Sequence, residues 1–415
     1  METHSLPICP PGGICFRQSF LLFSLVLLTA LSHGCAQPPK TAAKSAPSPA
    51  RHWWPVSMEV ALDRAGGNRA ELLKALSDAP RSQRPGLFFL LDNMPQADLE
   101  RVSAKFLLSN LAGAYATRSR VPWGKSIPED IFLNGVLPYV NIDERREDWR
   151  QLLHDQCAPL IADCQTPAAA AQRLNEKIFP QFKVKYSTQR KKANQSPSES
   201  IASGLASCTG LSILLIDACR SVGVPARLVG TPNWIDNRGN HTWVEVWDGR
   251  WHFLGAAEPD PQGLDHAWFQ GDAARAVKAS PEHAIYAASF RRTGLPFPLV
   301  WAPGVEAVSA ENVTDNYTST TAPAAAQTTR LLIKVLAAAN GPRVAADVTV
   351  TDTEAPAIQF TGRSRDERSD LNDLLTFEVP WHRTYRIVAH TGAKTATREF
   401  VCGTNALESI VLVLP

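Results

Sequence analysis

A cysteine at the start of a predicted helix is the residue whose placement most favours covalent chemistry. From Leu211 onward, apolar residues recur at i, i+3, i+4 and i+7, which predicts a helix packed on a core. Gly204 and Ser207 place Cys208 near the beginning of that helix, where unpaired backbone N–H groups and the helix dipole favour a thiolate. The same N–H groups can hold the oxyanion that forms when a thiolate attacks a carbonyl.

A histidine at the start of a predicted strand is the natural partner for this thiol. The segment from His241 alternates strictly and places His241 and Trp243 on the same face. Asp248-Gly249 is a turn signal, and residues Trp251–Leu254 return as the partner strand of a hairpin. A base on a strand that faces a nucleophile at a helix start is the Cys–His arrangement of thiol acyl transfer.

These segments resemble the transglutaminase-like superfamily, which shares the papain-like α+β core. The resemblance covers about residues 200–270 and is carried by two motifs, ASCTGLSILLIDACRSVGVPARLVG and NHTWVEVWDGRWHFLGAAEPD. It implies that Cys208 is the nucleophile and His241 the general base. It also implies an α+β fold class, with a helical N-terminal half and a core in which a helix packs on an antiparallel sheet.

The carboxylate that should orient the histidine departs from the family pattern. The family usually has Asp four residues after the Trp that opens the returning strand, and Gly255 occupies that position here. We expect Glu258 to take this role, with Asp260 second because Pro259 should end the strand before it. A two-residue or four-residue hairpin loop places Glu258 on the face of His241, whereas a three-residue loop turns it to the other face.

The residues leave the fate of a Cys208 thioester open. Water would make the protein a protease or amidase, and an amine would make it a cross-linking enzyme, with a protein or peptide as substrate in both cases. The alternative is a catalytically degenerate domain that serves as a surface binding or scaffold protein. The missing Asp favours this alternative, whereas Cys208 and His241 favour the enzyme.

Other candidate contacts are less strongly indicated. Trp243 and Trp234 are candidate substrate-binding residues, with hydrophobic packing as the competing interpretation for such aromatic side chains. The second oxyanion donor is open, and the upstream candidates are Tyr186, Gln189 and Gln195.

No cofactor and no metal site are expected. The chain lacks the HExxH spacing and the paired CxxC motifs of zinc sites. The acidic cluster of Asp370, Asn372 and Asp373 lacks the Gly and the distal Glu of a calcium loop.

The reactive segment lies in a chain that is long enough for two or three domains, with 415 residues. We expect a transglutaminase-like domain at 52–317, with its core at about 166–270. Alternating segments separated by turns predict a small β-sandwich at 330–415. This part resembles the carboxypeptidase-regulatory-like or Ig-like modules of exported proteins. Residues 37–51 and 318–329 have the composition of linkers.

The N-terminal residues 1–36 predict export. The apolar run Phe20–Leu31 has 12 residues, which suits a secretory signal and is shorter than the roughly 20 that a membrane span needs. The residues after this run are compatible both with cleavage after Ala36 and with a lipid on Cys35, so the expected location is the periplasm, cell envelope or extracellular space. Membrane attachment is expected only through this lipid.

The cysteines and the net charge bear on disulfide formation and on the class of partner. In an oxidising compartment Cys157 and Cys164 could pair. The balance of 42 basic against 40 acidic residues argues against a nucleic-acid partner.

Overall fold

The computed structural model describes residues 52–318 and 327–415. The predicted signal segment 1–36, the linker 37–51 and most of the linker 318–329 lie outside these residues, so they stay predictions. Residues Trp53–Pro415 form one unit by their contacts. Within the described part of the chain, no helix combines the length and apolar character needed to cross a membrane.

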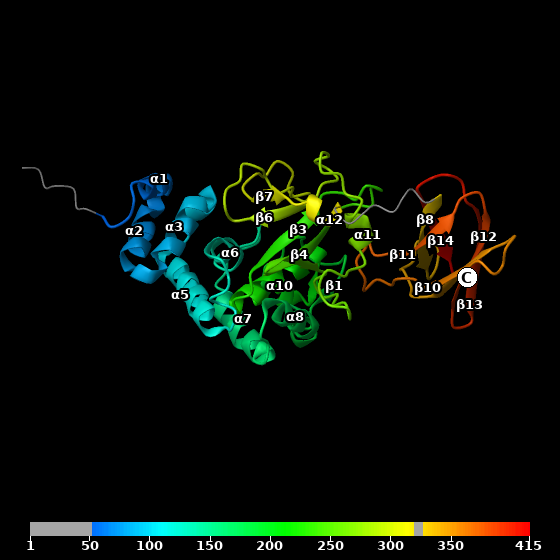
Figure 1. The fold of residues 1–415 in the computed structure, drawn as a ribbon, viewed down its shortest axis with the longest axis horizontal. Coiled ribbons are helices and arrows are strands. Elements are labelled where there is room, and N and C mark those ends of the chain that lie inside the picture. The colour runs from blue at the N-terminus through cyan, green and yellow to red at the C-terminus, as the bar shows by residue number, and fades with distance from the viewer. Residues whose placement is uncertain (1–51, 319–326) are drawn as a thin grey trace, which may run out of the picture. The chain divides into compact units, whose positions relative to one another are not determined.

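The first part of this unit is helical, as predicted (Figure 1). Helices α4 (Gln96–Leu99) and α5 (Ala104–Arg120) are separate, because the side chain of Ser103 accepts a hydrogen bond from Phe106 N–H and starts α5. Thr166 caps α8 (Pro167–Phe182) in the same way, with Pro167 in its first turn. The elements are α1 (Ser57–Arg64), η1 (Gly66–Asn68), α2 (Arg69–Asp78), η2 (Arg81–Gln83), α3 (Arg84–Asn93), α4 (Gln96–Leu99), α5 (Ala104–Arg120), α6 (Glu129–Gly135), α7 (Arg150–Cys157), η3 (Ala158–Ile161), α8 (Pro167–Phe182) and α9 (Pro197–Ser203).

The centre of the unit is one buried helix packed on an antiparallel sheet. Helix α10 (Cys208–Ser221) is buried on all sides, since every residue from Thr209 to Ser221 is buried, including the charged Asp217 and Arg220. It lies against β3 and β4 of a five-stranded sheet with the order β5-β4-β3-β6-β7 (Figure 1). The remaining elements here are β1 (Lys185–Tyr186), β2 (Leu205–Ala206), β3 (Ala226–Thr231), β4 (His241–Asp248), β5 (Arg250–Leu254), α11 (Gln270–Ala273), β6 (Tyr286–Ser289), β7 (Ser309–Asn312) and α12 (Asp315–Thr318).

The β4–β5 hairpin has the register of a three-residue loop. Trp247 pairs with Trp251 and Val244 with Leu254, so continued pairing would set His241 opposite residue 257. This is the register that was expected to turn Glu258 away from His241. The strand stops at Leu254, however, and a turn follows in which Glu258 bridges back to Gly255. The prediction that a two- or four-residue loop brings Glu258 to the face of His241 was therefore wrong. Glu258 instead approaches the site through the turn that follows Leu254.

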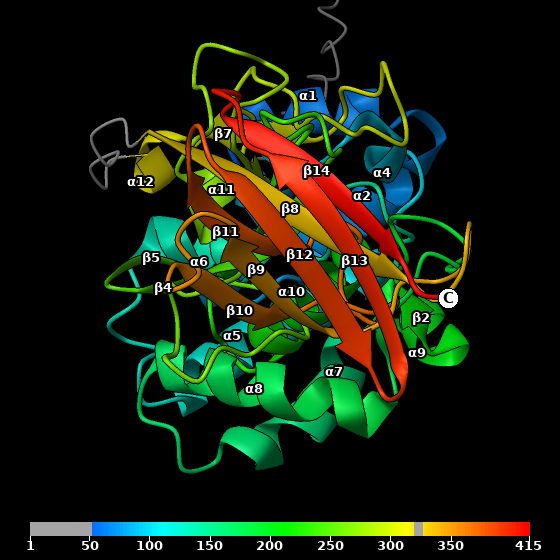
Figure 2. The ribbon, with the colours of Figure 1, turned by 90° about the vertical axis from the view of Figure 1, so that its right-hand side faces the viewer.

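The C-terminal part is a β-sandwich, as predicted. Figure 2 looks onto its strands, which form a four-stranded sheet β10-β9-β12-β13 and a three-stranded sheet β11-β8-β14 around a shared apolar core. Strand β13 is mostly exposed and packs Ala396 and Phe400 against the core. The strands are β8 (Thr328–Leu336), β9 (Asp347–Asp352), β10 (Gln359–Arg363), β11 (Leu375–Pro380), β12 (Thr384–Thr391), β13 (Lys394–Val401) and β14 (Leu407–Val413).

The two cysteines considered for a disulfide do not pair. Cys157 ends α7 and Cys164 follows η3, and both are free and buried. Each thiol packs into the apolar core that α7, α8 and α10 share. The disulfide suggested by their closeness in the sequence is therefore not present in the described structure.

Candidate active site

Cys208 is the first residue of α10, at the place predicted for a thiolate. The side chain of Ser207 caps the helix by accepting a hydrogen bond from Gly210 N–H at 3.0 Å. The cap thus leaves the first-turn N–H groups of Cys208 and Thr209 for other acceptors. Cys208 is half-buried, whereas the other described cysteines are buried. The thiol therefore combines partial access to solvent with a helix N-terminus.

His241 opens β4 inside a cage of aromatic rings. Its ring centroid lies 4.8 Å from that of Trp268 and 5.2 Å from that of Phe269. The rings of Trp234 and Trp243 lie at 6.0 Å each. The side chain is only 2% exposed. Packing on several sides fixes the plane of the imidazole, which a base must keep while it exchanges a proton.

The carboxylate beside His241 comes from the β-sandwich. Asp370 lies in the loop between β10 and β11, and its Oδ2 is 3.6 Å from Nδ1 of His241. Both side chains are 2% exposed. The sulfur of Cys208, a ring nitrogen of His241 and a carboxylate oxygen of Asp370 all lie within 4.8 Å of one another. A thiol, an imidazole and a carboxylate are therefore assembled from three separate segments of the chain.

The charges of this cluster support one another. Burial opposes protonation of His241, but the Asp370 carboxylate and Cys208 outweigh it and raise the pKa of the imidazole well above its usual range. Burial also opposes ionisation of Asp370, but His241, the N–H of Asn372 and Arg343 outweigh it and lower the pKa of that carboxyl. The arrangement thus favours an imidazolium next to an ionised carboxylate.

Glu258, the residue predicted to orient His241, lies in the same neighbourhood but has another partner. Its Oε2 accepts a hydrogen bond from the indole N–H of Trp268 at 2.8 Å. Burial raises the pKa of Glu258 to about 7, and the nearby Asp370 carboxylate adds to this, whereas His241 opposes it. Glu258 thus exchanges its proton near neutral pH.

The carboxylate of Glu258 occupies the space next to Gly255. A Cβ atom on Gly255 would lie 2.7 Å from Oε2 of Glu258 and 3.2 Å from its Cβ. A side chain at position 255 would therefore require the Glu258 carboxylate to shift. Asp260, the second candidate, accepts a hydrogen bond from Gln262 N–H within its own turn, and the structure gives it no contact with His241.

The two tryptophans predicted to bind substrate are packed inside the domain. Trp243 is fully buried and its indole N–H donates to the hydroxyl of Tyr317 at 2.8 Å. Trp234 is 2% exposed, and its indole N–H has no hydrogen-bond partner among the described residues. Neither ring lines an open surface, because each fills the aromatic core around His241, as the packing interpretation expects. Contact of either ring with substrate stays a prediction.

The three candidates for the second oxyanion donor lie in different surroundings. The Tyr186 phenol is close enough to Cys208 and Asp370 that both charges help raise its pKa, after the larger effect of burial. Gln195 is buried and donates to Ser203 and Leu205, whereas Gln189 is exposed. Of the three, Tyr186 is the one that the structure brings to the site.

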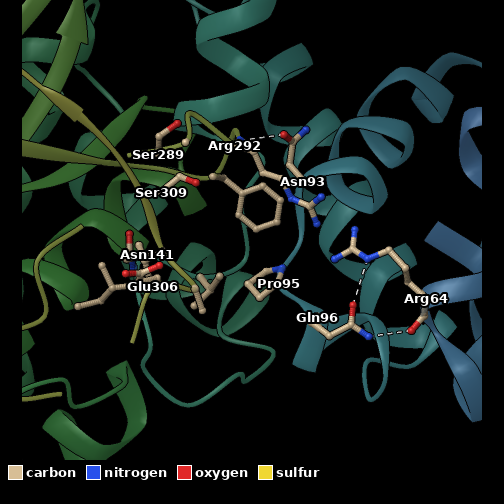
Figure 3. Close-up of a pocket in the computed structure, with 15 residues that line it drawn as sticks. Arg64, Asn93, Pro95, Gln96, Asn141, Ser289, Arg292, Glu306 and Ser309 are labelled. Atoms are coloured by element: carbon tan, nitrogen blue, oxygen red, sulfur yellow. Dashed lines mark hydrogen bonds between the residues drawn. The ribbon is translucent and has the colours of Figure 1, made fainter. Parts of the chain in front are cut away.

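Two cavities differ in their relation to this cluster. One of about 560 Å³ is lined by Glu258, Trp268 and Asp373, together with arginines 363, 365 and 368. Trp268 also packs on His241, but Cys208, His241 and Asp370 are not among the residues that line this cavity. Another of about 380 Å³ is lined by Arg64, Asn93 and other residues outside the cluster (Figure 3). Cys208, His241 and Asp370 are not among the residues that line this second cavity, where Arg64 donates to Gln96.

The reactive cluster also has donor atoms that suit a metal ion. A thiolate sulfur, an imidazole nitrogen and a carboxylate oxygen within 4.8 Å are ligands that zinc accepts. The sequence predicted no metal site, and nothing in the described structure tests that expectation. The same three side chains can therefore be considered for proton transfer or for metal binding, and experiment can separate the two.

Comparison with known proteins agrees with the motifs. Residues 155–256 match the family model of the transglutaminase-like superfamily, so the chain contains a transglutaminase-like domain, as predicted. This span includes Cys208, His241 and Gly255 and ends before Glu258. No curated protein matches the chain significantly.

Solved structures give only distant similarities. A protein from Cytophaga hutchinsonii proposed to be a cysteine protease aligns at 19% identity and a TM-score of 0.24, over 28% of this chain and 40% of its own. Red sea bream transglutaminase aligns at 9% identity and a TM-score of 0.31, over 71% of this chain and 65% of its own. The chain thus spans less than two thirds of either protein.

Proposed function

We propose that this protein is an exported thiol enzyme that acts on amide or peptide bonds through an acyl-thioester on Cys208. The observation that carries the proposal is the placement of Cys208 at a helix N-terminus beside a buried imidazole and a buried carboxylate. Export rests on the apolar run Phe20–Leu31 in the predicted signal segment, and attachment to a membrane would require a lipid on Cys35.

The reaction follows from the positions of these groups. His241 accepts the proton of Cys208, and the thiolate attacks the carbonyl carbon of the substrate amide. The negative charge that develops on the carbonyl oxygen is held by first-turn N–H groups of α10. The C–N bond then breaks, and His241 returns the proton to the departing amine. This leaves an acyl-thioester on Cys208 and a neutral imidazole.

The second half of the reaction reverses the proton transfer. His241 accepts a proton from water or from an amine, which attacks the thioester carbonyl, and the thiolate of Cys208 departs. Water gives hydrolysis and an amine gives a new amide bond. A peptide library incubated with and without added amine distinguishes these outcomes, because transamidation adds the mass of the amine to the product.

The proposed substrate class is a protein or peptide, because a Cys–His pair forms its thioester by attack on an amide carbonyl. The alternative, a catalytically degenerate scaffold protein, was favoured because Gly255 occupies the position of the family's Asp. A buried carboxylate within 3.6 Å of His241 weakens that support, because it can serve the same purpose.

Alkylation with iodoacetamide tests the proposal without a known substrate. We expect Cys208 to react at pH 6, well below the range near pH 8.5 where an unperturbed thiol ionises. Cys208→Ala controls for the other thiols, and peptide mass spectrometry assigns each label to its cysteine. His241→Ala should abolish the reactivity at pH 6. Reaction of wild-type Cys208 only above about pH 8.5, or only after unfolding, would refute the enzyme.

A further inference from the structure

We propose that the C-terminal β-sandwich completes the active centre, with Asp370 as the positioning residue for His241. This inference rests on the proposed thiol chemistry of Cys208. Within the family, the Asp belongs to the same domain as the thiol, whereas here the carboxylate comes from the loop between β10 and β11. The transglutaminase-like domain would therefore be catalytically incomplete without the β-sandwich.

The geometry of Asp370 suits this role. Its Oδ1 accepts a hydrogen bond from Asn372 N–H at 2.8 Å, which fixes the carboxylate and leaves Oδ2 for Nδ1 of His241. A proton held on Nδ1 leaves Nε2 free to accept the proton of Cys208. The distance of 3.6 Å is longer than a hydrogen bond, as is common before substrate binds, and a small rotation of either side chain shortens it.

Arg343 holds the loop in the shape that presents Asp370. Its guanidinium is buried and donates to the carbonyl of Ser369 at 2.7 Å and to that of Asp370 at 3.1 Å. Longer bonds at 3.4 Å reach the carbonyls of Leu371 and Asp373. One buried side chain of the β-sandwich thus donates hydrogen bonds to four backbone carbonyl groups of the loop that carries Asp370.

The loop is also held against the transglutaminase-like domain by hydrogen bonds with three of its residues, Tyr186, Arg238 and Asn240. The hydroxyl of Tyr186 accepts a hydrogen bond from Leu371 N–H at 3.0 Å. Arg238 donates to the carbonyl of Asn372 at 2.7 Å, and the Asn372 amide donates to the carbonyl of Asn240 at 2.9 Å. Arg238 and Asn240 closely precede His241 on the chain, so docking of the loop and placement of the imidazole are coupled.

The other titratable groups around His241 fit the role less well. Glu258 accepts its hydrogen bond from Trp268 and changes protonation near pH 7. Asp373 binds Arg365 at 2.8 Å and has its pKa raised, mainly by burial. Tyr186 accepts from the loop, and Cys208 is the reacting group itself. Asp370 is the carboxylate that faces Nδ1 of His241 directly, and its charge is favoured by its surroundings.

The test compares Asp370→Asn with Asp373→Asn in the full chain. Both changes neutralise a buried carboxylate in the same loop, but only the first removes the charge that faces His241. We expect Asp370→Asn to slow alkylation of Cys208 at pH 6 at least tenfold and to move the midpoint of the pH profile upward by one unit or more. Asp373→Asn should match the wild type. With a substrate in hand, kcat should fall by about 10²- to 10⁴-fold with little change in KM.

Asn372→Ala gives a second measurement that does not depend on how well Asp370→Asn folds. It keeps the backbone N–H that binds Asp370 but removes the amide that docks on Asn240. Loss of one docking hydrogen bond should slow alkylation at pH 6 by about two- to tenfold. The midpoint should shift in the same direction as in Asp370→Asn.

The outcomes separate this inference from the function on which it rests. If wild-type Cys208 does not react at pH 6, the thiol enzyme itself is refuted and the inference falls with it. If wild-type Cys208 reacts at pH 6 and His241→Ala does not, the enzyme stands. In that case, Asp370→Asn and Asn372→Ala profiles that coincide with those of Asp373→Asn and the wild type would overturn the role of the β-sandwich.

Discussion

Replacing Arg343 with Met tests whether the loop around Asp370 must be held in one shape. Arg343 is far in sequence from the proposed reacting groups, and the structure gives it no contact with Cys208 or His241. Met keeps most of the apolar length of the side chain, so packing in the β-sandwich should be largely retained. The change therefore removes the hydrogen bonds to the loop while it disturbs the core little.

The size of the effect follows from the two short hydrogen bonds, to Ser369 at 2.7 Å and to Asp370 at 3.1 Å. Each hydrogen bond from a charged donor contributes about 1.5–3 kcal/mol, or about 3–6 kcal/mol for the pair. Leu371 is 51% exposed, so water reaches this loop and can replace part of what is lost. We take about half, roughly 1.5–3 kcal/mol, which lowers the docked population of Asp370 by about 13- to 160-fold.

The assay is alkylation of Cys208 at pH 6, measured together with the thermal unfolding midpoint. Arg365→Met is the matched control, because it removes a guanidinium that binds Asp373 from the same loop. We expect slower alkylation in Arg343→Met and near wild-type alkylation in Arg365→Met, with both proteins folded. Equal alkylation in the two variants, at a reduced unfolding midpoint for Arg343→Met, would refute the argument.

Three further predictions concern the groups around His241. Because the pKa of His241 is raised above its usual value near 6.5, the imidazolium persists above that pH. The alkaline limb of the kcat/KM profile should therefore lie well above pH 6.5. In Asp370→Asn this limb should shift to lower pH. Added Zn²⁺ should inhibit by binding Cys208, His241 and Asp370, whereas loss of activity on treatment with EDTA would show that a metal is required. Glu258→Gln should change kcat by no more than about threefold and should remove a transition near pH 7 from the rate profile. Asp260→Asn should have no effect. A loss of kcat in Glu258→Gln as large as in Asp370→Asn would instead show that Glu258 has the orienting role that the sequence predicted.

Local patterns were sufficient to predict the elements that carry the thiol and the base. Apolar spacing after Cys208 identified α10, and strict alternation after His241 identified β4. These signals are reliable because each periodicity reflects burial of one element against its neighbours. The turn at Asp248-Gly249 was also predicted, but not its loop length. One residue of difference in that loop reversed the expected face of Glu258.

The position of Asp370 could not be predicted from periodicity. It lies in a loop, and a contact between two domains leaves no regular spacing between the residues that meet. The sequence did mark Asp370, Asn372 and Asp373 as an acidic cluster, and such a cluster is equally typical of a solvent-exposed turn. The burial of Arg343 and Asp370 is what distinguishes the two, and it becomes visible only in three dimensions.

Gly255 and Glu258 explain why the carboxylate would come from another domain. A Cβ atom at position 255 would lie 2.7 Å from Oε2 of Glu258, so an Asp there would require the Glu258 carboxylate to move. The double variant Gly255→Asp with Glu258→Ala should therefore restore a carboxylate within the transglutaminase-like domain. In that background, Asp370→Asn should slow alkylation of Cys208 at pH 6 by less than threefold, compared with at least tenfold in the otherwise wild-type chain.

Gly255→Asp alone is the control for this double variant. It should lower the unfolding midpoint, because two carboxyl groups then compete for the same space beside a buried imidazole. If Asp370→Asn is equally damaging in the double variant and in the wild-type chain, position 255 cannot replace Asp370. If the penalty disappears, the β-sandwich supplies a carboxylate that the family's own position would otherwise provide, and activity depends on docking of the loop only because Gly255 carries no carboxylate.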